Sequence, residues 1–365
     1  MSLPSPLFIG SEIYRNSSFG PSHPLRIPRV STVIDLCRAL GWLPPERYRT
    51  SPQAKPAALT LWHDPGYIAA LQTAEAEGTV SPQVRATYGL GTSANPVFPQ
   101  MFRRPATGAG GVMLAAELLT DGGVVHVPGG GTHHGLAARA NGFCYLNDVV
   151  LGMKVLRRNG IRRIAYVDID AHHCDGVEAA FAGDPQALLI SVHEARRWPF
   201  TGALAEDGGG NCFNLPVPRG FNDTEMRAVL EGLILPRLAA FRPEAVVLQC
   251  GADALAEDPL ARLALSNNAH WAVVAALMPI APRLLVLGGG GYDPHAVARC
   301  WTGVWATLAG EAIPEELPEA AQDLLWALPV KSPPPPHLLN TLRDAPREGP
   351  VRPEVLDSLA HLARR

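Results

Sequence analysis

The sequence lacks the features that mark secreted, membrane and nucleic-acid-binding proteins. Its six cysteines form no CxxC pair and no regular spacing, which is typical of reduced thiols in the cytoplasm. No apolar run approaches the roughly 20 residues that span a bilayer, and no signal peptide is evident at the start. The formal net charge of −3, without a basic stripe interleaved with aromatics, argues against a nucleic-acid partner. We therefore expect a soluble, cytoplasmic protein.

What the chain does have is ample material for a buried core. Of its 365 residues, 47% are hydrophobic and 18% are charged. Runs such as Ala-Val-Val-Leu and Leu-Leu-Val-Leu do not alternate with polar residues, which predicts strands buried on both faces. Because these strands alternate with helices, a parallel sheet is expected. The expected strands are 124–127, 163–168, 188–192, 245–249 and 284–287, and the expected helices are 107–119, 147–159, 223–241 and 267–278.

The tail from about residue 315 changes character. Residues 332–336 form a polyproline stretch, and residues 346–353 are again rich in proline and charge. We interpret residues 315–365 as a wrapping segment or a loose appendage, and a recruitment motif for a proline-binding partner is the alternative. There is no internal repeat and no convincing boundary. The sequence therefore predicts one catalytic domain over residues 1–365.

Polar residues gather where the expected strands end. Open parallel sheets bind their ligands at this edge, and two glycine runs, 129–131 and 288–291, lie there as well. The polar residues at or just beyond strand ends are His126, Asp168, Asp170, His193, Asp253 and Tyr292.

Three of the residues in these segments have the chemistry of metal ligands. Asp170 and His172 are two positions apart at a strand end, so both side chains leave the same face, and a parallel sheet brings Asp253 alongside. Two carboxylates and an imidazole suit a hard-to-borderline divalent cation and leave a coordination position open for water. The alternative is that these residues cap a helix or hydrogen-bond a loop. The combination with a histidine pair favours a metal hydrolase.

The histidine pair, His133 and His134, follows the first glycine run. Adjacent histidines can accept and donate protons in hydrolysis if each is oriented by a carboxylate, and Asp168 and Asp175 are the natural partners. Tyr292, after the second glycine run, can donate a hydrogen bond to a developing oxyanion. Taken alone, the histidines would be polar core residues and the tyrosine a packing residue at a loop edge.

Aromatic residues can form the walls of a narrow channel that leads to the metal. Gly142, Phe143 and Trp198 are the candidates, and we add Gly290 from the second glycine run. The alternative for Phe143 and Trp198 is a place in the core.

These segments resemble the zinc-dependent histone deacetylase superfamily, which includes bacterial acetoin-utilisation deacetylases and acetylpolyamine amidohydrolases. The similarity runs from about Gly10 to Gly310 in the family's order. The run Gly-Phe-Cys-Tyr-Leu-Asn-Asp is closer to the class I and acetoin-utilisation branches than to class II. The matching segments are 129–134, 142–148, 166–176, 249–259 and 288–292.

The resemblance implies a fold, a cofactor and roles for the residues. The fold is a three-layer α/β fold of the arginase/deacetylase type, with a central, mostly parallel sheet of eight strands. The cofactor is Zn²⁺, with Fe²⁺ as a substitute, together with a structural K⁺. The implied zinc ligands are Asp170, His172 and Asp253; the acid/base and orienting residues are His133, His134, Asp168 and Asp175, with Tyr292 polarising the carbonyl; the potassium residues are Asp168, Asp170, His172, Ser191 and Val192, with a second site near Phe181.

The chain departs from the family pattern in three places. Cys174 stands where the family usually has glycine, and we expect a buried, inert thiol. Ala94 stands where many relatives carry an aspartate that grips the substrate backbone, so that contact is expected to be missing. Arg196 and Arg197 give the channel rim an unusual charge, and they either contact an acidic substrate or are merely solvated.

The implied reaction is hydrolysis of an N-acyl amide, with acetyl or longer acyl groups removed most simply from lysine side chains of proteins. An acetylpolyamine or other small-molecule deacetylase is the alternative, and it predicts an acidic channel mouth and usually a dimer. A non-catalytic module that binds acylated ligands is an alternative of another class. A dimanganese ureohydrolase of the same fold is disfavoured, since there is a single Asp-x-Asp-x-His-His run.

Overall fold

An eight-stranded sheet forms the centre of the computed structural model, which describes residues 5–329 and 334–365. Every pairing between its strands is parallel, and the strand order is β2-β1-β3-β8-β7-β4-β5-β6. The α/β fold with a parallel eight-stranded sheet is thus confirmed. The strands are β1 (Leu7–Gly10), β2 (Tyr48–Thr50), β3 (Gly123–Val127), β4 (Ile164–Asp168), β5 (Ala187–Glu194), β6 (Cys212–Val217), β7 (Ala245–Gln249) and β8 (Arg283–Leu287).

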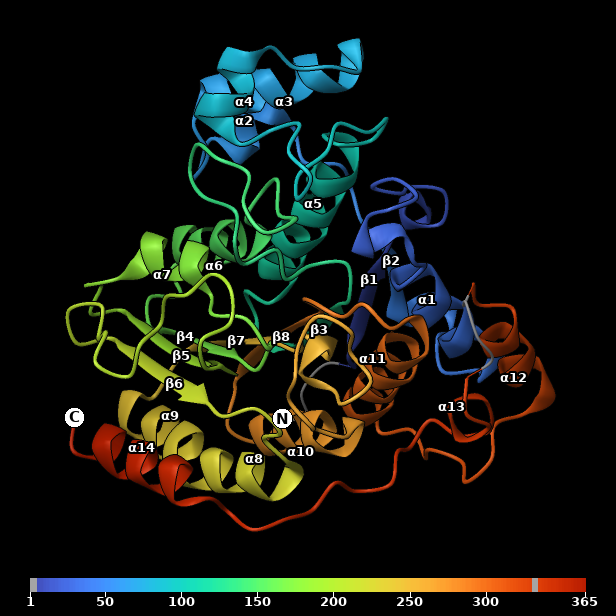
Figure 1. Ribbon diagram of the computed structural model, residues 1–365, viewed down its shortest axis with the longest axis vertical. Helices are drawn as coiled ribbons and strands as arrows, with labels where there is room; N and C mark the ends of the chain where they lie inside the picture. The colour runs from blue at the N-terminus through green and yellow to red at the C-terminus, as the bar shows by residue number, and fades with distance from the viewer. Residues whose placement is uncertain (1–4, 330–333) are drawn as a thin grey trace.

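Helices cover both faces of the sheet and make the three layers (Figure 1). One face packs against α5, α6 and α7, and the other against α1 and α8 to α11. The helices α2 to α4 project beyond the first layer. The helices are α1 (Val30–Ala39), α2 (Pro56–Leu59), α3 (Pro65–Glu77), α4 (Pro82–Tyr88), α5 (Arg103–Leu118), α6 (Asp148–Arg158), α7 (Asp175–Phe181), α8 (Asp223–Val229), α9 (Leu235–Phe241), α10 (Asn267–Leu277), α11 (Pro294–Ala309), α12 (Glu319–Trp326), α13 (His337–Asn340) and α14 (Pro353–Ala363).

The inner strands are where the apolar runs predicted them. All residues of β3, β4 and β7 are buried, because helices cover both faces. The predicted helix over 223–241 is present, and it contains a feature that the sequence pattern did not predict. A π-helical turn, Leu230–Ile234, separates α8 from α9. Pro236, the second residue of α9, has no N–H to donate to the preceding turn, and the wider π-helical turn accommodates the missing hydrogen bond.

The C-terminal tail runs along the helix layer and ends in α14 beside α9 (Figure 1). The buried Asp344 side chain lies 2.7 Å from the buried guanidinium of Arg299 in α11. Arg352 forms a further ion pair with Glu225 in α8. These contacts are in keeping with a wrapping segment, while a single-domain organisation stays a prediction. Residues 332 and 333 of the polyproline stretch lie outside the described residues.

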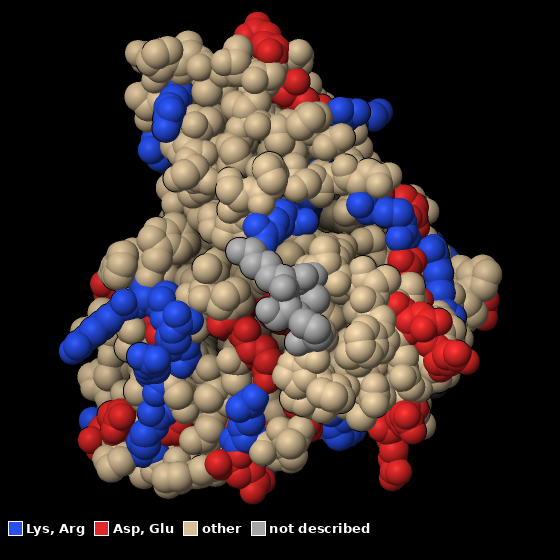
Figure 2. Space-filling model, turned by 45° about the vertical axis from the view of Figure 1, so that its right-hand side comes forward, with Lys and Arg blue, Asp and Glu red and all other residues tan. Residues whose placement is uncertain are grey.

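The surface carries charges of both signs. On the face in Figure 2, acidic and basic side chains are interspersed, and basic side chains gather at the lower left. Within residues 5–329 and 334–365, no helix combines the length and the apolar character that a membrane span requires.

Candidate active site

Three neighbouring strands bring the polar segments together at their carboxyl ends. Asp168 is the last residue of β4 and pairs in register with Gln249, the last residue of β7, and Gln249 pairs with Leu287 of β8. The segments that follow these strands therefore meet at one edge. They supply Asp170 and His172 after β4, Asp253 after β7 and the glycine loop 288–291 after β8.

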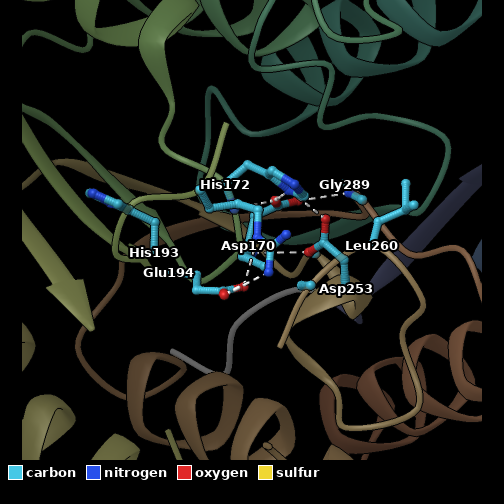
Figure 3. Close-up of polar contacts among 12 residues, drawn as sticks. Asp170, His172, His193, Glu194, Asp253, Leu260 and Gly289 are labelled. Atoms are coloured by element: carbon cyan, nitrogen blue, oxygen red, sulfur yellow. Dashed lines mark hydrogen bonds and ion pairs between the residues drawn. The ribbon is translucent and has the colours of Figure 1, made fainter. Parts of the chain in front are cut away.

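Asp170, His172 and Asp253 converge on one point, as Figure 3 shows. The Nδ1 atom of His172 lies 2.9 Å from Oδ2 of Asp253 and 3.3 Å from Oδ1 of Asp170. One ligand atom from each residue lies within 4.8 Å of the others, and all three side chains are buried. Two carboxylates and an imidazole at this spacing fit a divalent cation, and among the described residues this is the only such group.

Backbone groups fix the two carboxylates of this triad. Asp253 Oδ1 accepts a hydrogen bond from the N–H of Ala171, and Asp170 Oδ2 accepts one from the N–H of Gly290. A Cβ atom at Gly290 would lie 1.9 Å from Asp253 Oδ2, so only glycine lets the loop approach this closely.

The electrostatics of the triad also suit a cation. Burial lowers the pKa of His172, but Asp253 and Asp170 outweigh it and raise that pKa to about 10. Burial and the neighbouring Asp170 raise the pKa of Asp253. Two buried carboxylates need a compensating positive charge, which the proton on His172 supplies in part. A divalent cation would take the place of this proton.

Each histidine of the pair is bound to its own carboxylate. Nδ1 of His133 lies 2.7 Å from Oδ2 of Asp168, and Nδ1 of His134 lies 2.6 Å from Oδ1 of Asp175. The two imidazole rings are 3.9 Å apart between centroids. The structure therefore contains the two predicted His–Asp pairs, and both Nδ1 atoms donate if the carboxylates are ionised.

The pKa values of the two histidines move in opposite directions. Burial lowers the pKa of His133, but Asp168 and Asp170 outweigh it and raise that pKa to about 9. Burial and the neighbouring His133 lower the pKa of His134 to about 4, although the hydrogen bond that His134 donates to Asp175 acts in the opposite direction. His134 is therefore neutral near pH 7, with its Nε2 atom free to accept a proton, whereas His133 holds its proton.

Tyr292 completes the site beside the second glycine run. Its backbone N–H donates to Asp258 Oδ2 at 2.7 Å, and its ring meets Phe143 edge-on at 5.8 Å between centroids. Burial and the nearby Asp253 raise the pKa of the phenol well above its usual value. The hydroxyl therefore stays protonated and can donate a hydrogen bond.

A cavity of about 500 Å³ opens above these residues. His134, His172 and Tyr292 line it, and Gly142, Phe143 and Trp198 also contribute. Gly142 has φ +51°, and a Cβ atom there would lie 2.2 Å from the Trp198 ring. The wall therefore requires glycine at this position. Gly290 lines a smaller cavity beneath, together with His133 and Asp170.

Two histidines at strand ends do not join the site. His126 points into the helix layer, where its ring stacks near Trp305 and contacts Phe8 edge-on. The side chain of His193 points away from the triad (Figure 3), and its Nε2 atom bonds to the carbonyl of Gly202. Side chains alternate between faces along a strand, so a place near the strand end did not suffice.

The potassium site stays a prediction. Asp168 pairs in register with Ser191, so Ser191 and Val192 lie beside the Asp168–His172 segment. The Ser191 hydroxyl bonds to Nδ1 of His193. Phe181, the residue of the second predicted site, ends α7, and its side chain packs in the core beneath α5 and α6.

The departures from the family pattern have clear places. Cys174 is buried just before α7, and burial raises the pKa of its thiol well above the usual value, so it stays protonated. Ala94 lines the cavity, and its carbonyl bonds to Nε2 of His23. Arg197 is not merely solvated, since it forms an ion pair with Glu194.

No motif in the sequence pointed to Arg29. This arginine is half-buried ahead of α1, and its Nη1 atom donates to the carbonyl of Gly289 at 2.8 Å. It also lines the smaller cavity, together with Gly290, His133 and Asp170. It thus supports the loop that carries Tyr292, although it lies far away in the chain. Only the three-dimensional structure brings it there.

Comparisons with known proteins agree with this site. Residues 23–308 match the family model of the histone deacetylase domain. Histone deacetylase 9 of Arabidopsis thaliana is 35% identical over 310 residues, which cover 82% of this chain and 72% of that protein. The acetoin utilization protein AcuC of Bacillus subtilis is 32% identical over 326 residues, covering 86% of this chain and 84% of that protein. The crystal structure of an HDAC homologue from Aquifex aeolicus is 36% identical, covers 99% of this chain and 100% of that one, and superposes with a TM-score of 0.94.

The chain therefore belongs to the histone deacetylase family. The predicted placement in the branch with the acetoin-utilisation proteins is confirmed, as is the predicted class of amide-hydrolysing deacetylase.

Proposed function

We propose that this protein is a zinc-dependent amidohydrolase that removes acetyl or longer acyl groups from acylated lysine side chains of proteins. The observation that carries the proposal is the buried Asp170–His172–Asp253 triad beside two His–Asp pairs at the foot of one cavity. The aromatic side chains of Phe143 and Trp198 in the cavity wall suit an aliphatic side chain that ends in an amide.

The residues of the chain divide the reaction between them. When bound by the triad, zinc supplies a Lewis acid that polarises the amide carbonyl and makes water a better nucleophile at neutral pH. His134 takes a proton from the attacking water at Nε2, since Asp175 holds its Nδ1 atom. His133, which holds its proton, donates to the leaving amine. The Tyr292 hydroxyl donates to the carbonyl oxygen as negative charge develops there.

The other candidate functions have less support. An acetylpolyamine substrate calls for an acidic mouth, but none of the carboxylates in the described part of the chain lines the cavity. A binding module without turnover does not need the two His–Asp pairs. A dimanganese site needs a second set of ligands, and the described residues offer a single group. Fe²⁺ in place of zinc, a structural K⁺ and a cytoplasmic location stay predictions; the location is supported by six free, buried cysteines.

A substrate panel tests the proposal. The zinc-loaded chain is assayed on acetyl-lysine and longer acyl-lysine peptides and on acetylspermidine, with and without a chelator. We expect hydrolysis of an acyl-lysine peptide that the chelator abolishes and added zinc restores. Zinc binding without hydrolysis of any acyl amide would contradict the proposal.

The role of Tyr292 is tested by a Tyr292→Phe variant. Because the hydroxyl donates where charge develops, its loss should lower kcat by roughly a hundredfold or more. The zinc content, measured by metal analysis, should stay the same, since the hydroxyl is no ligand. Undiminished turnover would remove this assignment.

A further inference from the structure

Among the described residues that line the cavity, arginine is the only type with a permanent charge, and we call the part lined by Arg139 and Arg197 the mouth. Arg139 and Arg197 line it, and apart from the site histidines the remaining lining residues are uncharged. A channel that admits a cationic substrate needs carboxylates to balance the charge, as in the polyamine alternative. This mouth offers the opposite sign.

Arg139 is held at the mouth with no carboxylate partner. Its Nη1 atom donates to the carbonyls of Ala86 and Thr87 at 2.8 and 3.0 Å, and its side chain lies against Gly89. These two carbonyls fix the exposed guanidinium but leave its charge uncompensated, since no described carboxylate forms an ion pair with it. The side chain of Asp64, whose backbone N–H bonds to the nearby Ala137, is turned to the start of α3, where it accepts from Tyr67.

Arg197 lies on a different loop and forms an ion pair with a buried carboxylate. Its Nε and Nη2 atoms donate to Glu194 at 2.9 and 2.7 Å, and Glu194 also accepts from the N–H of Arg262 at 2.8 Å. The Glu194 side chain is 7% exposed, whereas that of Arg197 is 28% exposed. The guanidinium therefore faces the mouth and the carboxylate faces inward.

Two more arginines lie near Arg197, and the carboxylates nearby accept hydrogen bonds from backbone N–H groups. Arg196 and Arg262 are exposed, and no described carboxylate pairs with either. Glu206 accepts from the N–H groups of Gly202 and Ala203. The buried Asp258 accepts from the N–H groups of Leu260 and Tyr292. Neither Glu206 nor Asp258 lines the cavity, whereas Arg139 and Arg197 do, so the permanent charges in its lining are positive.

We infer that the enzyme selects acyl-lysine residues whose neighbours in the protein substrate are acidic. The inference rests on the proposed function and names its substrate class: an acyl amide that presents carboxylates to Arg139 and Arg197 while the acyl-lysine chain enters the cavity. A polycationic acetylpolyamine meets repulsion at the same place.

The first experiment compares three acetyl-lysine peptides that differ only at the two residues flanking the lysine: aspartate, alanine or lysine. With the zinc-loaded full-length chain at low ionic strength, kcat/KM should be about fivefold higher for the aspartate peptide than for the alanine peptide, and lower again for the lysine peptide. At about 1 M salt, where the Debye length falls to about 3 Å, the differences should shrink. Equal kcat/KM values for the three peptides would overturn the inference.

The second experiment assigns the preference to the mouth. Arg139→Gln should reduce the ratio of aspartate to lysine peptide, and Arg139→Glu should invert it. Arg49→Gln is the matched control, because Arg49 is exposed and also donates to two carbonyls but does not line the cavity. A ratio that Arg139→Glu leaves at the wild-type value would overturn the inference.

Binding to the metal-free chain separates this inference from the proposed function. Fluorescence anisotropy of the three labelled peptides should show the same order of affinity without any turnover. If no peptide is hydrolysed but the aspartate peptide binds best, the proposed reaction fails and the charge selection stands. If hydrolysis occurs and the three peptides bind equally, the charge selection fails alone.

Discussion

The two His–Asp pairs have nearly the same hydrogen-bond geometry but different surroundings. The Nδ1–carboxylate distances, 2.7 Å for His133 and 2.6 Å for His134, are almost the same. Yet the pKa of His133 is raised to about 9, whereas that of His134 is lowered to about 4. A carboxylate partner alone therefore does not decide the charge of an imidazole.

The difference has a simple electrostatic cause. His133 feels a second carboxylate, since its Nε2 atom lies 3.8 Å from Oδ1 of Asp170. His134 faces its cationic neighbour and the edge of the Trp198 ring instead. In the metal-free protein, these two adjacent histidines therefore have opposite protonation states at neutral pH, because the triad lies closer to one of them.

The largest expected effect on kcat comes from removing each imidazole in turn, which tests whether the two histidines differ in role. His134→Ala should lower kcat by about a thousandfold, because a general base contributes between roughly 10² and 10⁴. His133→Ala should cost less, about a hundredfold, because a solvent proton can replace the donor. Steady-state kinetics on an acetyl-lysine peptide measures both, with zinc content as the control. A larger loss for His133→Ala would reverse the assigned roles.

Replacing the carboxylates should have smaller and distinguishable effects. Asp175→Asn should lower kcat by roughly ten- to a hundredfold, since His134 loses the partner that orients it. Asp168→Asn should in addition weaken metal binding and lower the melting temperature, because Asp168 also accepts from Tyr166 and from the N–H of Asp170. Metal titrations and thermal unfolding check this difference. Equal metal affinity in the two variants would mean that Asp168 does not support the triad.

The proton on His172 predicts how metal affinity depends on pH. In the metal-free protein His172 holds a proton below its pKa of about 10, so a bound metal must displace that proton at neutral pH. The apparent affinity should therefore rise with pH, by up to about tenfold per unit between pH 6 and 9. Calorimetry in buffers of different ionisation enthalpy counts the released protons. Binding without proton release would contradict a raised pKa at His172.

Local patterns in the sequence predicted the triad because its chemistry is concentrated in short segments. Asp170 and His172 stand in one motif, and Asp253 follows a strand whose apolar run is plain. Arg29 and Arg139 come from loops whose sequences have no regular pattern, and only the packing of the chain brings them to the cavities. Long-range placement of this kind leaves no mark in a single sequence.

The fold shows the same division between local and distant information. Buried inner strands such as β4 and β7 are continuous apolar runs, so they were predicted. The strands β1 and β2, of four and three residues, were not predicted. The edge strand β6 contains Pro216 and Asn214, which an edge position tolerates and which obscure the run. The number of eight strands came from the family resemblance.

The ion pair between Arg299 and Asp344 connects the C-terminal tail to the helix that follows Tyr292. Helix α11, which contains Arg299, is capped by Asp293, the residue directly after Tyr292. Arg299 also donates to the carbonyl of Thr341 at 2.7 Å. A protein shortened before residue 341 would lack both partners of the buried Arg299 guanidinium. This unpaired charge would lie in α11, the helix that begins beside Tyr292. We therefore expect residues 341–344, some fifty positions beyond Tyr292, to help hold Tyr292 in place.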